Sequence, residues 1–368
     1  MTPEPATLEP VSIARATAAA RRRPPVSRYD LTRADFERLL GSAAGYRVDQ
    51  LWESLYRRFE EPARARGLPR ELRERLAGEP SLSPALELEA ESVADSGDTV
   101  KWLFRCAGAA EVETVLMHHP RRSTACVSSQ AGCAMACAFC ATGQAGFRRH
   151  LGVGEILEQV VRAARAARER GRRLDHVVVM GMGEPLANYD NVLDALRRVV
   201  RDVGIGARRL TVSTVGVVPG IRRLAREPLQ LNLAVSLHAA NDPLRDRLVP
   251  LNRRYPIGVL VEACEEYLAA THRRISLEWA LIDGVNDRSS DADELAAIAR
   301  RLRAHVNLIP LNPTPGYHAR GTSAQGVRAF GDRLAGAGVN VTVRRTRGRS
   351  IDAACGQLAA RASAGARS

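Results

Sequence analysis

The sequence predicts an α/β protein whose body is a partial barrel of six β/α units, preceded by a small helical domain. Three observations support this fold class. The chain has 368 residues, apolar strand-like runs alternate with helical patterns from residue 124 onward, and polar or glycine-rich segments stand where those runs end. A chain of this length accommodates one large body of about 200–250 residues and a smaller attachment.

The N-terminal part is predicted to hold three regions. Residues 1–28 contain three consecutive arginines followed by two prolines, and they lack the apolar stretch of a secretory signal, so they are expected to form a disordered basic leader. Residues 29–85 carry apolar residues at helical spacing and predict a helical accessory domain. Residues 86–123 hold two short alternating segments around a glycine-bearing turn, which predict a β-hairpin extension.

Residues 124–340 form the predicted core, and residues 341–368 form a C-terminal segment. Alternation of strands and helices in series favours a parallel sheet, in which chemistry is found at the carboxyl ends of the strands. Strands are expected at 125–128, 176–180, 210–214, 231–237, 275–281 and 306–310. Helices are expected at 153–170, 188–203, 220–226, 259–271, 291–303 and 324–334.

Composition narrows the class of protein. The chain has 54 lysine and arginine residues against 41 aspartate and glutamate residues, a net charge of +13 that favours a polyanionic partner such as nucleic acid. Lys101 is the only lysine, so a codon bias toward arginine explains the charge equally well. No apolar run approaches the roughly 20 residues needed to span a membrane, and a cytoplasmic location is expected.

The seven cysteines point to a metal or redox role, since an odd number without an export signal does not suit a disulfide framework. Cys133, Cys137 and Cys140 lie on one short loop after the first predicted strand. Three thiolates can hold three irons of a cubane cluster and leave the fourth iron open. Zinc would need a fourth ligand, for which only His150 is near, and three clustered cysteines on a glycine- and alanine-rich loop fill a core poorly.

The segment from Cys126 to Phe147, CVSSQAGCAMACAFCATGQAGF, resembles the RlmN/Cfr family of radical S-adenosylmethionine RNA adenine methyltransferases, and more closely its RlmN branch. The resemblance covers nearly all of residues 29–358 and implies a partial (β/α)6 radical SAM barrel. It continues through VVMGMGEPL at 178–186, LVPLNRRYPI at 248–257, LIDGVND at 281–287, VNLIPLNP at 306–313 and VRRTRGRSIDAACGQL at 343–358.

This resemblance implies a site and its cofactors. Cys133, Cys137 and Cys140 would hold one [4Fe–4S] cluster per subunit, and two S-adenosylmethionine molecules would be consumed per methylation. Taken singly, the glycines of GMGEP could form an ordinary turn, and a histidine at a strand end is usually structural. The residues implied to bind S-adenosylmethionine are Gly183, Glu184, Ser213, Ser236, Leu237, His238 and Asn312.

The resemblance also implies a mechanism, because carbon 2 of adenine is electron-poor and does not attack a methyl group directly. Cys355 would first carry the methyl group, a radical formed on it would add to the adenine, and Glu113 would accept a proton. Cys126 would then attack Cys355, releasing methyladenosine and leaving a disulfide. Without the resemblance, Glu113 would be an ordinary exposed strand carboxylate. Cys355 stands in a glycine- and arginine-rich segment that predicts a mobile loop.

The implied partners are ribosomal RNA, transfer RNA and an electron donor such as flavodoxin or ferredoxin, with no membrane and a monomeric chain. The helical domain would bind RNA, and Cys106 and Cys264 are expected to be buried thiols. His150 stands where the family usually has asparagine. Arg57 and Arg58 stand beside Tyr56 in the helical domain. The arginines that could contact phosphates, or alternatively form solvated charge runs, are Arg148, Arg149, Arg344, Arg345, Arg347 and Arg349.

Two other functions use the same features. A Cfr-type enzyme would methylate carbon 8 of adenosine in ribosomal RNA with the same set of residues. A non-catalytic iron–sulfur or zinc protein would only bind RNA. The presence of both Cys126 and Cys355 argues against mere binding, since that needs neither thiol.

Overall fold

The computed structural model describes residues 27–41, 45–344 and 347–359. The leader expected at residues 1–28 lies outside them except for Ser27 and Arg28, which are buried. Within the described ranges, no helix is long and apolar enough to cross a membrane.

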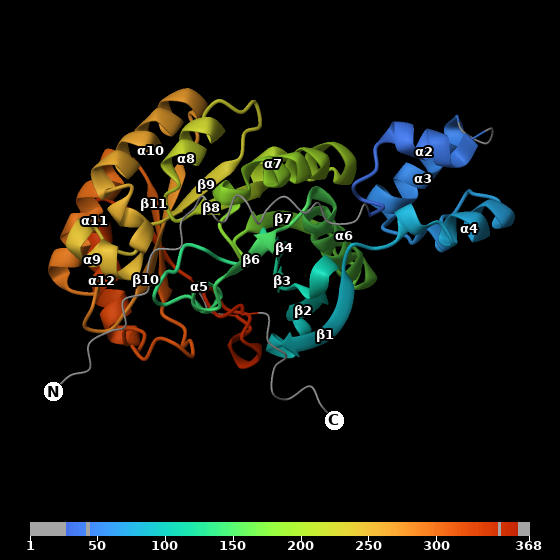
Figure 1. Ribbon diagram of the computed structural model, residues 1–368. Coiled ribbons are helices and arrows are strands. Elements are labelled where there is room, and N and C mark those ends of the chain that lie inside the picture. Colours follow the sequence, from blue (N-terminus) through green and yellow to red (C-terminus); the bar gives the residue numbers. More distant parts are fainter. Residues whose placement is uncertain (1–26, 42–44, 345–346, 360–368) are drawn as a thin grey trace.

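One curved sheet of ten strands organises the molecule, in the order β1-β2-β3-β4-β7-β8-β9-β10-β11-β12 (Figure 1). Strands β1 to β4 pair antiparallel, and every neighbouring pair from β4 to β12 is parallel. The edge strands β1 and β12 do not pair with each other, so the barrel is partial, as predicted. The strands are β1 Glu87–Ala94, β2 Thr99–Arg105, β3 Glu111–His119, β4 Arg122–Cys126, β7 Leu174–Val179, β8 Leu210–Thr214, β9 Asn232–Ser236, β10 Ile275–Leu281, β11 His305–Pro310 and β12 Asn340–Val343, with a separate pair β5 Gln130–Gly132 and β6 Phe147–His150.

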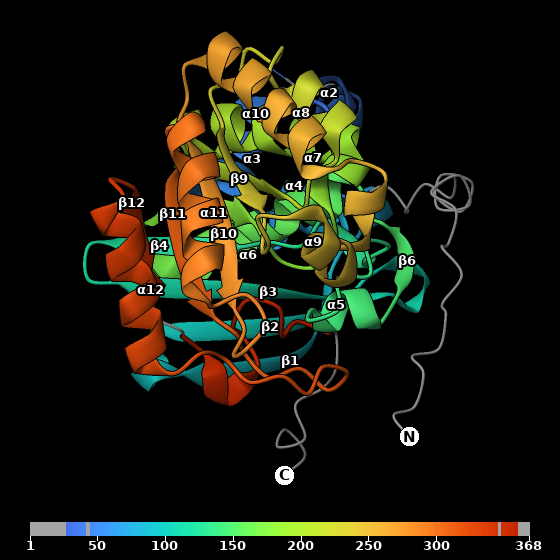
Figure 2. The same cartoon turned by 90° about the vertical axis from the view of Figure 1, so that its left-hand side faces the viewer.

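Helices cover the outer face of the parallel strands, as Figures 1 and 2 show. Many of them present one apolar face to the sheet; in α6, for example, the buried positions include Ile156, Val160 and Ala167. The α-helices are α2 Arg33–Leu40, α3 Tyr46–Glu53, α4 Arg70–Ala77, α5 Ala141–Gln144, α6 Val153–Glu169, α7 Tyr189–Arg198, α8 Val218–Leu224, α9 Asp242–Leu248, α10 Ile257–Thr271, α11 Ser289–Arg301 and α12 Ala324–Gly336.

The N-terminal region is helical, as predicted, and it packs beside α6 and α7 (Figure 1). Arg198 of α7 joins the two parts, since its guanidinium donates to the carbonyl oxygens of Tyr29 and Leu31 and to the hydroxyl of Tyr56. Arg165 of α6 donates in the same way to the carbonyl oxygen of Phe59. The region is therefore attached to the core through contacts of half-buried arginines.

The structure corrects three expectations. The predicted hairpin at residues 86–123 is a row of three antiparallel strands that continues the main sheet, because β1 precedes the two expected strands. The parallel part gains a seventh strand, β12, which begins one residue before the expected C-terminal segment. Helix α9 was not expected between β9 and α10.

The segment after β12 crosses the open side of the barrel toward β1–β3. Arg347 donates to the carbonyl oxygen of His118 over 2.8 Å, and the Gly348 amide donates to Asp95 over 2.9 Å. Lys101 of β2 donates to the carbonyl oxygen of Asp352 over 3.4 Å. The C-terminal segment thus bridges the two edges of the sheet and lies over the carboxyl ends of the parallel strands.

Candidate active site

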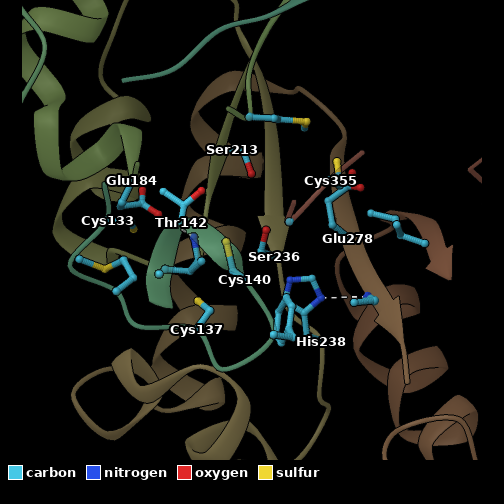
Figure 3. Close-up of a pocket in the computed structure, with 18 of the residues that line it drawn as sticks. Cys133, Cys137, Cys140, Thr142, Glu184, Ser213, Ser236, His238, Glu278 and Cys355 are labelled. Atoms are coloured by element: carbon cyan, nitrogen blue, oxygen red, sulfur yellow. Dashed lines mark hydrogen bonds between the residues drawn. The ribbon is translucent and has the colours of Figure 1, made fainter. Parts of the chain in front are cut away.

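A cavity of about 150 Å³ lies at the carboxyl ends of the parallel strands (Figure 3). The residues around it come from the cysteine loop, from the ends of β7 to β11 and from the C-terminal segment. In Figure 3, Cys133 and Cys137 lie on one side, while Cys355 and Glu278 lie on the other. The predicted site residues that line it are Cys133, Cys137, Cys140, Gly183, Glu184, Ser213, Ser236, His238, Asn312 and Cys355.

The cysteine loop brings three thiols to this cavity. The Cys133 amide donates to the carbonyl oxygen of Gly146, and the Cys140 amide donates to that of Cys137, which folds the loop into tight turns. Burial, with the neighbouring thiol of Cys140, raises the pKa of Cys133 to about 12 and raises the pKa of Cys137 well above its usual value. Thiolates at these positions therefore need a cationic group beside them, which a metal cluster supplies.

The donor set fits a cluster better than a single ion. In the part of the chain that the structure describes, no three His, Cys, Asp or Glu side chains converge closely enough to hold one metal ion. Zinc requires such convergence, whereas each thiolate of a cubane site binds its own iron. His150, the candidate fourth zinc ligand, instead pairs through Nδ1 with the side-chain nitrogen of Gln130 over 2.9 Å.

Glu184 is a buried carboxylate fixed by the backbone. Its two oxygens accept from the amides of Leu186 (3.0 Å) and Val215 (2.9 Å), and its own amide donates to Gln130 over 2.8 Å. Burial raises its pKa to about 7. Gly183 precedes it at a φ of 99°, where a Cβ would lie 2.5 Å from Gln130, so only glycine suits this close approach. A cationic ligand group in the cavity would stabilise the ionised carboxylate.

His238 presents a neutral imidazole to the cavity. The amide of Ala280 donates to Nδ1 over 2.9 Å, which leaves the ring proton on Nε2. Burial and, to a smaller extent, the charge of nearby Arg245 lower the pKa of His238 to about 3. The ring of Phe139 from the cysteine loop packs edge-on against it. His238 is therefore held as a hydrogen-bond donor, a role that suits a polar ligand.

Asn312 carries a polar atom that the protein leaves unused. Its Nδ2 donates to the carbonyl oxygen of Cys355 over 3.2 Å, while its buried Oδ1 has no hydrogen-bond partner in the described structure. Such an orphaned acceptor fits a ligand that donates a hydrogen bond. Leu237 differs from the other expected residues, since its side chain packs in the core and does not line the cavity.

The loop that carries Cys355 is hydrogen-bonded to the cysteine loop in this structure, and its mobility stays a prediction. The amide of Ala141 donates to the carbonyl oxygen of Gly356 over 2.8 Å, and the hydroxyl of Thr142 donates to that of Leu358 over 2.5 Å. Because Ala141 directly follows Cys140, the backbone around Cys355 is fixed relative to the three cysteines.

Cys126 and Cys355 both raise the pKa of the same arginine, Arg344. Arg344, the residue after β12, lines the cavity, and its pKa is raised chiefly by the negative charge available at Cys355, then by Glu278 and Cys126. Burial and, to a smaller extent, the charge of Cys355 raise the pKa of Cys126 to about 12. Cys126 is buried and does not line the cavity, but both cysteines lie close enough to Arg344 to interact with its charge.

Glu113 is buried, not exposed as its strand position suggested, and it does not line the cavity. One carboxylate oxygen lies 2.7 Å from the ammonium of Lys101, and the other accepts from the amide of Ala359 over 2.8 Å. The C-terminal segment therefore covers Glu113 in this structure. Cys106 and Cys264 are buried thiols, as expected.

Most of the arginines expected to contact RNA instead form hydrogen bonds or ion pairs with protein groups. Arg347 is bonded to the backbone of His118, Arg149 forms two hydrogen bonds with Glu155, and Arg57 donates to two carbonyl oxygens of the core. Arg58 pairs with Glu53, and Arg344 is in the cavity. Arg148 is exposed; Arg345 and the side chain of Arg349 lie outside the described residues.

Four contributors to the site were not predicted from the sequence: Thr142, Arg245, Glu278 and the cavity position of Arg344. Arg245 is completely buried and donates to the carbonyl oxygens of Val215, Ser236 and Leu237, which fixes the ends of β8 and β9. Glu278 could have been identified from the sequence, because it is a charged residue inside the apolar run of β10.

Comparison with known proteins agrees with this geometry. The family model of the radical SAM superfamily matches residues 127–296. A probable dual-specificity RNA methyltransferase RlmN of Parafrankia sp. is 49% identical, covering 93% of this chain and 94% of its own. Dual-specificity RNA methyltransferase RlmN 1 of Myxococcus xanthus is 48% identical, with 90% and 94% covered.

A solved structure gives the same result for the fold. The crystal structure of a radical SAM methyltransferase from Sphaerobacter thermophilus is 49% identical and superposes with a TM-score of 0.87, covering 92% of this chain and 100% of that one. The cysteine loop and the ligand groups around it suit the [4Fe–4S] cluster and the S-adenosylmethionine that this superfamily uses. The chain therefore belongs to the RlmN dual-specificity RNA methyltransferases, which are radical SAM enzymes.

Proposed function

We propose that this enzyme methylates carbon 2 of adenosine in large-subunit ribosomal RNA and in transfer RNA, through a methylated Cys355 and a covalent protein–RNA adduct. The observation that carries the proposal is that Cys355 and Arg344 line the cavity that also holds the three loop cysteines. Cys126, buried at the end of β4, lies close enough to Cys355 and Arg344 for their charges to interact. A protein that only binds RNA has no use for two further thiols at this place.

The side chains divide the work of holding the cofactors. Cys133, Cys137 and Cys140 would bind the cluster, which when reduced supplies the electron that cleaves S-adenosylmethionine. The carboxylate of Glu184 suits the amino group of that cofactor, and His238 Nε2 and Asn312 Oδ1 offer one donor and one acceptor to its other polar groups. We further propose flavodoxin or ferredoxin as the electron donor and a monomeric, cytoplasmic enzyme.

Cys355 is the methyl carrier in this proposal. Its sulfur forms a bond to the methyl group as the bond from that group to the sulfonium of S-adenosylmethionine breaks. The organic radical made by cleavage of a second S-adenosylmethionine would take one hydrogen atom from this methyl group, and the carbon radical left on Cys355 would add to the adenine. The adduct would then give up one electron to the electron carrier and one proton. Cys126 would attack the sulfur of Cys355, the sulfur–carbon bond of the adduct would break, the released carbon would take up a proton to complete the methyl group, and a disulfide would remain.

Glu113 would take the proton lost from the adenine in this sequence. In the structure its carboxylate is occupied by Lys101 and by the amide of Ala359. Access of the adenine to Glu113 therefore requires residues 358 and 359 to withdraw. The N-terminal helical region is proposed as an RNA-binding accessory part.

The decisive experiment maps the modified base. Anaerobically reconstituted enzyme is incubated with unmodified ribosomal RNA fragments and transfer RNA, and the digested RNA is analysed by mass spectrometry. We expect 2-methyladenosine, and none with the Cys355→Ala variant. A methyl group on carbon 8 would identify a Cfr-type reaction, and unmodified RNA would contradict the proposal.

A further inference from the structure

A second, open hollow lies beside the active-site cavity and is called here the outer groove. Its walls are the loop at residues 313–322, the beginning of α12, the end of β12 and the segment that carries Cys355. Its volume is about 1080 Å³, much larger than the cavity, and Leu311 lines both spaces. A chain lying in the outer groove would pass directly beside the catalytic cavity.

The walls of the outer groove are tied to the catalytic loops. Gln144 of α5 donates to the hydroxyl of Thr314 over 3.1 Å and accepts from the amide of Gly316 over 3.0 Å. On the other wall, Gln357 donates to the carbonyl oxygen of Pro313 over 3.3 Å. The 313–322 loop is thus held both to the helix after the cluster cysteines and to the segment of Cys355, and the groove is preformed.

Two cations in the groove have no counter-ion. Arg320 and Arg328 are exposed, and neither side chain makes a hydrogen bond or ion pair within the described ranges. His318 is exposed beside them. The one acidic lining residue, Asp352, accepts a hydrogen bond from Gln357. This differs from Arg149 and Arg347, whose charges are used inside the protein, and it favours an anionic occupant.

Apolar surface lies between these charges. Val343 is 46% exposed, and Pro313 and Ala319 offer further apolar atoms at the surface. Tyr317 is half-buried, with part of its ring against the small core of the cysteine loop. Separated cations with an apolar floor and an aromatic ring suit single-stranded RNA, whose phosphates pair with arginine while its bases and riboses contact apolar and aromatic groups.

We infer that the outer groove holds the RNA strand next to the adenosine that enters the cavity, with Arg320 and Arg328 on its phosphates. The inference rests on the proposed function in that RNA is the substrate. It gives the RNA backbone a binding place that the other site residues do not provide. Arg344 and Arg347, which flank Cys355, are bound inside the protein. The strand would also lie against the wall that carries Cys355.

The test compares two pairs of substitutions. Arg320→Gln with Arg328→Gln removes the groove charges, and Arg226→Gln with Arg300→Gln removes two exposed arginines that precede β9 and β11 at the amino ends of the strands. Binding of a labelled single-stranded RNA is measured from 50 to 200 mM salt. Each lost phosphate contact lowers the salt slope by about 0.7, so the groove variant should lose about 1.4 and the control variant should match wild type.

This difference in salt slope can be measured directly as a difference in RNA affinity. Across a fourfold salt range, wild-type enzyme should lose about sevenfold more of its RNA affinity than the groove variant. Iron content and thermal unfolding midpoint of both variants establish that they are folded. Equal salt slopes for the groove and control variants would overturn the groove assignment. Failure of wild-type enzyme to bind or methylate any RNA would instead overturn the proposed function, so the two failures are distinguishable.

Discussion

The ammonium of Lys101 lies 2.7 Å from the carboxylate of Glu113, and the two side chains are 5% and 2% exposed. Lys101 is the only lysine of the chain, and it stands on β2 directly beside the strand of Glu113. The same lysine donates to the carbonyl oxygen of Asp352 in the C-terminal segment. Lys101 thus links Glu113, the candidate base on β3, to the C-terminal segment that carries Cys355.

Lys101→Met should lower the free energy of unfolding by about 3–5 kcal/mol, because it leaves a buried carboxylate without its cation. The double variant Lys101→Met with Glu113→Gln should recover most of this loss. Urea unfolding of the cluster-free chain followed by circular dichroism provides the measurement. A Lys101→Met chain as stable as wild type would show that this ion pair contributes nothing.

Alanine at any one of Cys133, Cys137 and Cys140 should abolish stable iron binding, whereas wild-type chain reconstituted without oxygen should hold about four irons and four sulfides. Cys264→Ala is the matched control, since it removes a buried thiol of α10 that is remote in sequence from the loop. Iron and sulfide analysis decides the matter. Stoichiometric zinc without iron in freshly purified anaerobic protein would overturn the cluster assignment.

Alanine variants of Cys355 and Cys126 should stop the reaction at different steps. Cys355→Ala should abolish methyl transfer because the carrier sulfur is gone, while Cys126→Ala should proceed to the protein–RNA adduct and stop there. Denaturing gels of each variant expressed in cells, with and without nuclease, reveal the adduct, and iron content is measured alongside. A Cys126→Ala chain that keeps its cluster but shows no nuclease-sensitive band would refute the resolving role.

Affinity for S-adenosylmethionine should rise with pH around neutrality. Burial raises the pKa of Glu184 to about 7, above its usual 4.5, so the cofactor-free chain loses stability as pH rises between these values. The ionised carboxylate suits a cationic amino group, and its population increases about tenfold from pH 6 to pH 8 when the pKa is about 7.

Calorimetric titration of cluster-loaded enzyme should therefore show severalfold tighter binding at pH 8 than at pH 6. The gain stays below tenfold because the α-amino group of the cofactor loses its proton near pH 8. Glu184→Gln keeps the shape of the side chain and removes its titration, so it should bind more weakly and with a flatter pH profile. The same pH profile in both proteins would assign the titration to another group.

Parallel strands were predictable because they are buried on both faces and read as apolar runs. For this reason the expected bounds of β10, which is buried at all but one position, agree with the structure to the residue. The bounds of β8 agree as well, although its buried positions alternate. Strand β12 has four residues, none of them buried, and β1 is mostly exposed, so neither gives such a run. Helix α9 is short and rich in charged residues.

In the site, too, local features could be predicted from the sequence and long-range features could not. The spacing of Cys133, Cys137 and Cys140 is local, so the sequence alone indicates the cysteine site. The burial of Glu113 and the cavity position of Arg344 depend on contacts between segments more than 200 residues apart, as in the hydrogen bond from Ala359 to Glu113. The anchored loop of Cys355 depends on hydrogen bonds to Ala141 and Thr142, which no local pattern predicts.

The bridge made by the last described residues affects the order in which the protein can become active during synthesis. A nascent chain that has emerged as far as β12 contains the loop cysteines and all ten strands of the sheet. It still lacks Cys355, which leaves the ribosome tunnel after all of these elements. Under the proposed mechanism, such a chain has the three loop cysteines but no methyl carrier, so a product terminated there would not become covalently attached to the RNA around it.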